Sequence, residues 1–395
     1  MKWKFLLTAV SFCMLSVMAI AQSKKSALTY RFATQAEAQM LVTDIDSYTS
    51  QLNQFDIEAR LQKQGGRKSQ LLTLGMNEAR NWSDADKEKI KKAMTAIETE
   101  IRKQKYTLPV PGEIILLKSG MAEEGGALAY TRENWIAVGE KALNELSEDD
   151  LTRLMAHELF HLMTRTDRNF KSAMYQTIGF TVLDREINFP AEMLEKRISN
   201  PDISSYDSYA TYTIGGNAQK CTMIIYTEKP YSNGSLFDYL KIGLVPLNEE
   251  MIPLQQDGKT IIYSLDDATD FYDQVGKNTS YVIHPEEILA DNFALTLINK
   301  AATVKYNTLD ALIQSFLCDY FAKLCCCINV VSFLQVCFHI FLKSGSGNQC
   351  ISNCIVNNLS IHMIITSKHS ETRSFSCTTE TVTQFSMFIY TNFAS

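Results

Sequence analysis

The segment His157-Glu158-Leu159-Phe160-His161 constrains this chain more than any other feature, because two histidines four residues apart on a helix share one face. Two imidazoles placed in this way can hold a single Zn²⁺, and the intervening glutamate lies about 100° further around the helix. Its carboxylate then faces a water beside the metal rather than the metal itself. A chain with six histidines can contain this pattern by chance, so the neighbouring sequence has to support it.

The neighbouring sequence predicts a buried helix. Ser147 stands before three acidic residues, which is typical of a helix N-cap with carboxylates at the positive end of the dipole. Arg165 and Arg168 follow where a helix C-terminus favours cations. Apolar residues surround much of the helix between these ends: Leu151, Leu154, Met155, Leu159, Leu162 and Met163. The alternative is a core helix in a noncatalytic binding module, with both histidines only hydrogen-bonded.

A zinc enzyme needs a third protein ligand and keeps a fourth position for water. His284 precedes Pro285, and proline suits the first position of a helix. On that helix Glu287 and Asp291 are four residues apart and therefore share a face. Glu287, His284 and Glu286 are the candidate third ligands in this second segment.

Together the two segments resemble the gluzincin metallopeptidases, which include thermolysin and the CaaX-type membrane endopeptidases. In that group HExxH is followed by a helix with ExxxD, here Glu287-Ile288-Leu289-Ala290-Asp291. The resemblance implies that His157, His161 and Glu287 bind zinc, that Glu158 is the catalytic acid and base, and that Asp291 orients a histidine ligand. Independently, a metal-bound imidazole needs an acceptor for its other N–H. The 126 residues between His161 and Glu287 exceed the thermolysin spacing, which predicts an insertion between the helices.

The N-terminus resembles a bacterial secretory signal. Lys2 and Lys4 precede an uncharged apolar run, and Ala19-Ile20-Ala21 matches a cleavage site. We therefore expect a secreted or periplasmic protein after cleavage near Ala21.

The last eighty residues differ in composition from the rest of the chain. Residues 316–395 contain eight cysteines and only seven charged side chains, whereas residues 22–315 contain Cys221 alone. A stretch at residues 324–342 without charged side chains is long enough for a membrane anchor. We favour instead a tail that is not part of the fold, with a membrane anchor or a cysteine-rich module as alternatives.

The remaining chain predicts an α+β fold, a zincin-like metallopeptidase domain with a helical N-terminal lead-in and a small β-rich insertion. The expected boundaries are 1–21 for the signal peptide, 22–105 for the helical region, 106–315 for the catalytic domain and about 200–280 for the insertion. We also expect a helix from Thr34 to Asn53, a hairpin turn at Asp257-Gly258 and a strand from Thr260 to Leu265. In gluzincins the strand just before the HExxH helix is a sheet edge that binds extended peptide. An ordinary interior strand is the alternative for residues 135–138.

These features predict a zinc-dependent metallopeptidase that hydrolyses peptide bonds with one Zn²⁺ ion. Zinc would polarise the scissile carbonyl and activate a water, with Glu158 as general base. The candidates for stabilising the oxyanion are His284 and one of Tyr206, Tyr209, Tyr212 and Tyr281; a packing or surface role is the alternative for these tyrosines. The expected partner is a peptide or protein substrate; a net charge of −6 argues against nucleic acid. The alternative is a zinc-binding but inactive envelope protein.

Overall fold

The computed structural model describes residues 28–104, 106, 108–299, 363–366 and 372–375. These residues fall into two compact units, one within residues 1–315 and one within residues 316–395. The second contributes one antiparallel hairpin of β12 (Met363–Thr366) and β13 (Thr372–Phe375). The predicted signal peptide and the apolar stretch at 324–342 lie outside the described residues. Within the described ranges, no helix is long and apolar enough to cross a membrane.

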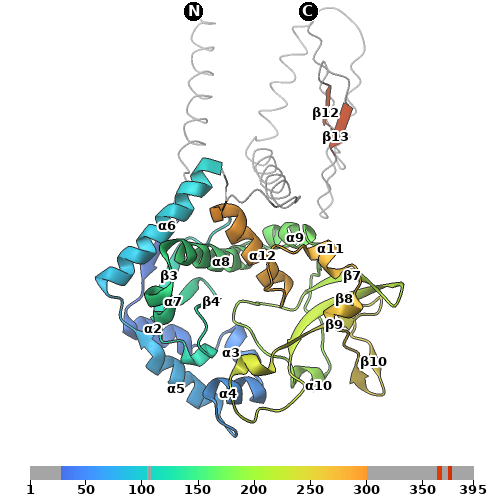
Figure 1. The fold of residues 1–395 in the computed structure, drawn as a ribbon, viewed down its shortest axis with the longest axis horizontal. Coiled ribbons are helices and arrows are strands. Elements are labelled where there is room, and N and C mark those ends of the chain that lie inside the picture. Colours follow the sequence, from blue (N-terminus) through green and yellow to red (C-terminus); the bar gives the residue numbers. More distant parts are fainter. Residues whose placement is uncertain (1–27, 105, 107, 300–362, 367–371, 376–395) are drawn as a thin grey trace, which may run out of the picture. The chain divides into compact units, whose positions relative to one another are not determined.

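The first unit is built on a five-stranded mixed sheet in the order β1-β3-β5-β4, with β2 paired to β3 (Figure 1). Its strands are β1 (Tyr30–Phe32), β2 (Ala79–Arg80), β3 (Ile114–Ser119), β4 (Ala129–Arg132) and β5 (Trp135–Gly139). The strands β1, β3 and β5 are parallel, whereas β4 runs antiparallel along the edge. The last strand before the HExxH helix is therefore interior, and its hairpin partner β4 is the edge strand.

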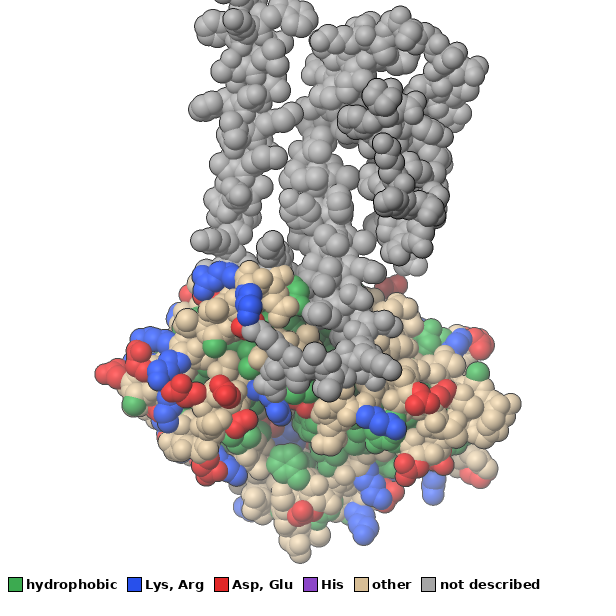
Figure 2. Space-filling model, turned by 45° about the horizontal axis from the view of Figure 1, so that its top comes forward, with side chains coloured by type: hydrophobic (Ala, Val, Ile, Leu, Met, Phe, Trp, Pro, Cys, Tyr) green, Lys and Arg blue, Asp and Glu red, His purple; other side chains and the backbone are tan. Residues whose placement is uncertain are grey.

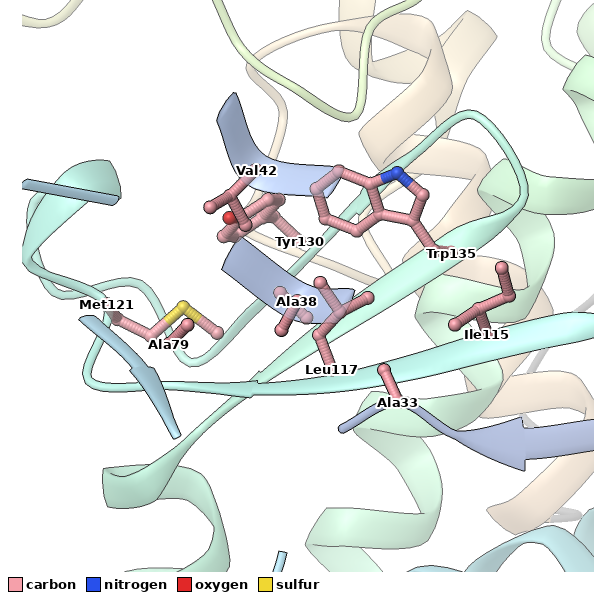
Figure 3. Close-up of a cluster of buried hydrophobic side chains, with 10 residues drawn as sticks. Ala33, Ala38, Val42, Ala79, Ile115, Leu117, Met121, Tyr130 and Trp135 are labelled. Carbon is pink, nitrogen blue, oxygen red and sulfur yellow. The ribbon is translucent and has the colours of Figure 1, made fainter. Parts of the chain in front are cut away.

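Helices cover both faces of this sheet. The helices of this part are α2 (Gln35–Thr43), α3 (Ser47–Gln51), α4 (Gln54–Leu61), α5 (Lys68–Glu78), α6 (Asp84–Gln104), η1 (Ala122–Glu124), α7 (Glu140–Glu145), α8 (Glu148–Thr166) and α9 (Arg168–Gln176). Figure 3 shows Ala38 and Val42 of α2 among the buried side chains Leu117, Tyr130 and Trp135. Side chains alternate along a strand, so every second residue points to the other face of the sheet. On that face α8 contacts β4 and packs along α6.

The insertion forms a separate antiparallel sheet in the order β6-β7-β8-β9. Its elements are β6 (Thr181–Val182), α10 (Ala191–Leu194), β7 (Ser208–Ile214), β8 (Asn217–Tyr226), η2 (Leu236–Tyr239), β9 (Lys241–Pro246), β10 (Gln255–Gln256), β11 (Lys259–Thr260), η3 (Leu265–Asp267) and α11 (Phe271–Val275). The chain then returns to the first sheet through α12 (Pro285–Ala294) and the π-helical turn η4 (Leu295–Asn299). The expected α+β class is confirmed.

Several local predictions are confirmed and others are corrected. Asp257-Gly258 forms the predicted hairpin turn, with both residues at positive φ. A single helix expected from Thr34 to Asn53 is instead broken, because Asp46 caps α3 through the Thr49 N–H. The strand expected at residues 260–265 is mostly irregular. The N-terminal region is also not purely helical, since it supplies β1 and β2 to the main sheet.

On the face seen in Figure 2, the Lys and Arg side chains are interspersed with Asp and Glu side chains. Neither sign gathers into one large patch on that face. This mixture is typical of a solvated surface.

Candidate metal centre

The centre lies where α8 packs against α12, two helices more than a hundred residues apart in sequence (Figure 1). Ser147 caps α8 by accepting the Asp150 N–H, and Pro285 is the first residue of α12. His157 and His161 project from α8 toward Glu287 of α12. The Glu287 Oε2 lies 3.1 Å from His157 Nε2 and 3.6 Å from His161 Nε2.

These three atoms fit a zinc ion. Ligand atoms about 2.0–2.2 Å from a tetrahedral zinc lie roughly 3.3–3.5 Å from one another. The Nε2 of His161 is fully buried and has no hydrogen-bond partner among the described residues. A buried polar atom without a partner is costly, and a cation between the two rings and the carboxylate would satisfy it.

Each histidine is held by a carboxylate at its other ring nitrogen. Asp291 Oδ1 lies 3.0 Å from His157 Nδ1, and Glu286 Oε1 lies 3.0 Å from His161 Nδ1. Both contacts leave Nε2 turned toward Glu287. This is the arrangement that fixes the tautomer of a metal-ligating imidazole. Burial lowers the pKa of His157, but its bonds to Asp291 and Glu287 outweigh that effect and raise the pKa.

Glu286 is placed as a support for His161 rather than beside the proposed ion. Its carboxylate also accepts hydrogen bonds from Thr164 Oγ1 and Tyr175 OH, each at 2.6 Å. Burial raises the pKa of Glu286, but the bond to His161 and the neighbouring cations outweigh it and lower the pKa to about 2. Of the candidate third ligands, Glu287 alone joins His157 and His161 in one cluster of the described residues.

His284 caps the helix instead of joining the cluster. Its Nδ1 accepts the Glu286 N–H at 3.2 Å, and its ring packs edge-on against Tyr206 at 5.3 Å between centroids. Burial lowers the pKa of His284 to about 3, so its imidazole is neutral. Tyr281 lies on the open side of the centre, 41% exposed, with its ring centroid 6.4 Å from that of His157.

Glu158 is held from the edge strand. Thr131 of β4 donates its Oγ1 hydrogen to Glu158 Oε2 at 2.6 Å, and the Glu158 side chain is buried. Helix α8 therefore presents His157 and His161 to α12, while Glu158 faces the strand. The Glu158 carboxylate is fixed next to the edge strand, within 4.8 Å of a ring nitrogen of His161.

The sequence does not single out two further residues at the centre. Asn200 Nδ2 donates to Glu287 Oε1 at 2.6 Å, and the Thr131 N–H donates to Asp202 Oδ1 at 2.6 Å. The only signal is Asn200-Pro201-Asp202 itself, whose composition indicates a turn. A turn signal gives no indication of which distant residues the turn contacts.

The centre carries an excess of negative charge. Asp202 is half-buried and lies near the Glu158 carboxylate, and both the partial loss of water and the neighbouring charge raise the pKa of Asp202. Glu286, Glu287 and Asp291 add three more carboxylates around two imidazoles. Like charges at this separation repel strongly, and a divalent cation would compensate them.

Access to the centre is one-sided. The His157 side chain is 12% exposed, whereas those of His161 and Glu287 are essentially buried. A polar pocket of about 510 Å³ lies next to the segment around Asn200 and is also lined by Arg165 of α8.

Comparisons with protein-family models, with curated proteins and with solved structures found no match for this chain.

Proposed function

We propose that this chain is a zinc-dependent metallopeptidase of the gluzincin type, with a zincin-like domain. The observation that carries the proposal is the convergence of His157 Nε2, His161 Nε2 and Glu287 Oε2, with each Nδ1 already held by a carboxylate. A structural histidine pair in a helix core does not need this doubled arrangement.

When bound, zinc would act as a Lewis acid on the scissile carbonyl and lower the pKa of the attacking water. Glu158 takes the proton of that water and then delivers it to the leaving amine. The hydroxyl of Thr131 holds the Glu158 carboxylate in place for both transfers. Asp291 and Glu286 keep the imidazoles oriented, and Asn200 fixes Glu287.

The edge strand supports a peptide as the substrate. An extended peptide can add to the outer edge of β4 through backbone hydrogen bonds, independently of its side chains, once Asp202 leaves the Thr131 N–H. Thr131 connects that edge to Glu158, so a peptide paired there would pass close to the general base. Tyr281 stands on the open side and is the proposed oxyanion donor. The signal-like N-terminus supports export to the periplasm or medium.

A zinc-binding but catalytically inactive protein is the second candidate. The observation in its favour is that Asp202 occupies the Thr131 N–H, which is the backbone donor that a paired peptide would need. Such a protein would hold the metal and cleave nothing.

The test is a comparison of metal content and hydrolysis in the full chain and three variants. We expect about one zinc per wild-type chain, loss of zinc in His161→Ala, and full zinc without hydrolysis in Glu158→Gln. The exposed Asp149→Asn on the same helix is the matched control and should retain both properties. Unchanged zinc content in His161→Ala contradicts the site. Bound zinc without hydrolysis of a broad peptide mixture by the wild type favours the inactive protein.

A further inference from the structure

The residues 199–203, called the covering segment below, run across the centre from one side. Asn200 donates to Glu287, and the Pro201 carbonyl accepts from Arg165 Nη2 at 2.6 Å. Asp202 accepts the Thr131 N–H from β4. Three consecutive residues of an irregular segment thus contact α12, α8 and the edge strand.

Asp202 belongs to a second group of metal-ligand atoms. Carboxylate oxygens of Asp202 and Glu158 and a ring nitrogen of His161 all lie within 4.8 Å of one another. His161 is shared with the first group, in which it joins His157 and Glu287. Two ligands of one zinc ion lie at most about 4 Å apart, so Asp202 is already close to the distance that joint coordination requires.

One oxygen of Asp202 remains available for a metal. Oδ1 accepts the Thr131 N–H, whereas Oδ2 accepts no hydrogen bond from the described residues. The Nε2 of His161, in contrast, is buried and has no partner in the described part of the chain. A cation between the two atoms would give His161 Nε2 its missing partner and neutralise the Asp202 carboxylate.

The covering segment is anchored firmly at Ser199. The Ser199 N–H and hydroxyl both donate to the Asp56 carboxylate, at 2.9 and 2.7 Å. The Ser199 carbonyl accepts from Arg60 Nη2 at 2.6 Å. Asp56 and Arg60 are fully buried on α4, and Arg60 also pairs with Glu124. Asp202 is therefore held beside His161 by a network that starts in the N-terminal region.

We propose that Asp202 is a fourth protein ligand of the metal, on the side of His161 that faces Glu158, given the zinc site proposed above. Four protein ligands make a closed centre, whereas three leave a position for water. Asp202 then holds the centre in a closed state and keeps the Thr131 N–H from pairing with a peptide. Opening the centre requires the covering segment to withdraw Asp202.

The experiment is cobalt(II) titration of the full chain, followed by addition of sodium azide. The visible spectrum of protein-bound cobalt(II) changes with the number and type of its ligands. In the wild type we expect a spectrum that azide does not alter. Asp202→Asn keeps an acceptor for the Thr131 N–H but lacks the charged oxygen. It should bind cobalt about tenfold more weakly or worse, because even losses outside the ligand set cost this much.

Azide should alter the cobalt spectrum of Asp202→Asn, because its fourth position is open. Ser204→Ala, in an exposed position next to the covering segment, should behave as the wild type. Asp202→Ser is the second variant if Asp202→Asn does not fold. Equal cobalt affinity and an equal azide response in wild type and variant overturn the assignment of Asp202.

The outcomes also separate this proposal from the proposed function. Cobalt binding that persists in His161→Ala removes the zinc site and the Asp202 assignment together. The expected cobalt results in a protein that cleaves no peptide leave Asp202 as a ligand and overturn only the peptidase proposal.

Discussion

Helices α8 and α12, which carry the proposed zinc ligands, and the covering segment meet at one centre, but different forces hold them there. Helices α8 and α12 pack through fully buried apolar side chains such as Leu159, Phe160 and Phe293. The covering segment is held by hydrogen bonds and ion pairs to Asp56 and Arg60. Apolar packing tolerates many single changes, whereas a buried polar network fails when one partner is removed. The comparison predicts that single substitutions disturb the covering segment more than the three proposed ligands on α8 and α12.

The largest effect is expected from Arg60→Ala. In the native protein the Arg60 guanidinium lies 3.1 Å from the Asp56 carboxylate and 2.8 Å from the Glu124 carboxylate. The change leaves both buried carboxylates without their cation. Breaking a buried ion pair costs about 3–5 kcal/mol, which urea unfolding measures. The exposed Arg67→Ala is the matched control and should stay within about 0.5 kcal/mol.

The same variant also tests whether the contacts of Ser199 hold the covering segment in place. Where Arg60→Ala remains folded, azide should reach cobalt as it does in Asp202→Asn, because Ser199 loses one of its partners. A stability loss below about 1 kcal/mol would show that the network is solvated and that the contrast with the helices is wrong.

Helices α8 and α12 could be predicted from the sequence because the residues that determine them are close together in the chain. The cap at Ser147, the spacing of His157 and His161 and the proline at 285 all act within a few residues. Glu287 follows from the same reasoning, since helical periodicity places it on one face with Asp291. Its contact with the two histidines could be inferred only through the resemblance to a family.

The position of the covering segment could not be predicted from the sequence, because the contacts that fix it to α4, α8, α12 and β4 are distant in sequence. Asp202 and Thr131 are 71 residues apart, and Asn200 and Glu287 are 87 apart. The broken helix at Asp46 has the same cause. Asp46 pairs with Arg132, 86 residues away, and this tertiary contact accompanies the cap that interrupts the predicted helix.

A second prediction concerns the pH dependence of stability and Glu123, which lies next to the buried polar network. Glu123, beside Glu124 in η1, is buried, and burial raises the pKa of its carboxyl from 4.5 to about 7. The folded protein therefore keeps a proton that the unfolded chain releases above about pH 4.5. The contribution of Glu123 to the free energy of unfolding is therefore highest below about pH 4.5 and falls as the pH rises to about 7. A shift of this size corresponds to about 3 kcal/mol.

Glu123→Gln cannot ionise, so this part of the pH dependence should disappear. Its amide oxygen can still accept the hydrogen bonds that Ser119 and Tyr130 donate to Glu123. Urea unfolding of wild type and variant at pH 5 and pH 8 gives the difference directly. An equal loss of stability in both proteins between these pH values would show that Glu123 is ionised throughout.

A third prediction concerns Asp291 of α12 and its contribution to zinc affinity. Asp291→Ala removes the acceptor 3.0 Å from His157 Nδ1 but leaves all three proposed ligands in place. Zinc affinity should fall about 10- to 100-fold, as measured by competition with a chelator. The exposed Asp149→Ala on α8 should leave the affinity unchanged. An unchanged affinity in Asp291→Ala would mean that packing alone orients His157.

The smallest effect is expected at the start of α8, where Ser147 accepts the Asp150 N–H at 3.1 Å. Ser147→Ala exposes that donor to solvent and should lower the free energy of unfolding by about 1 kcal/mol. Because the cap lies almost three turns before His157 and the helix is held by buried side chains, zinc affinity should not change. Thermal unfolding and chelator competition on the same preparation measure both quantities, with Ser204→Ala as the serine control. A loss of zinc affinity in Ser147→Ala would show that the position of α8 depends on its N-cap. The helix would then be as sensitive to single substitutions as the covering segment.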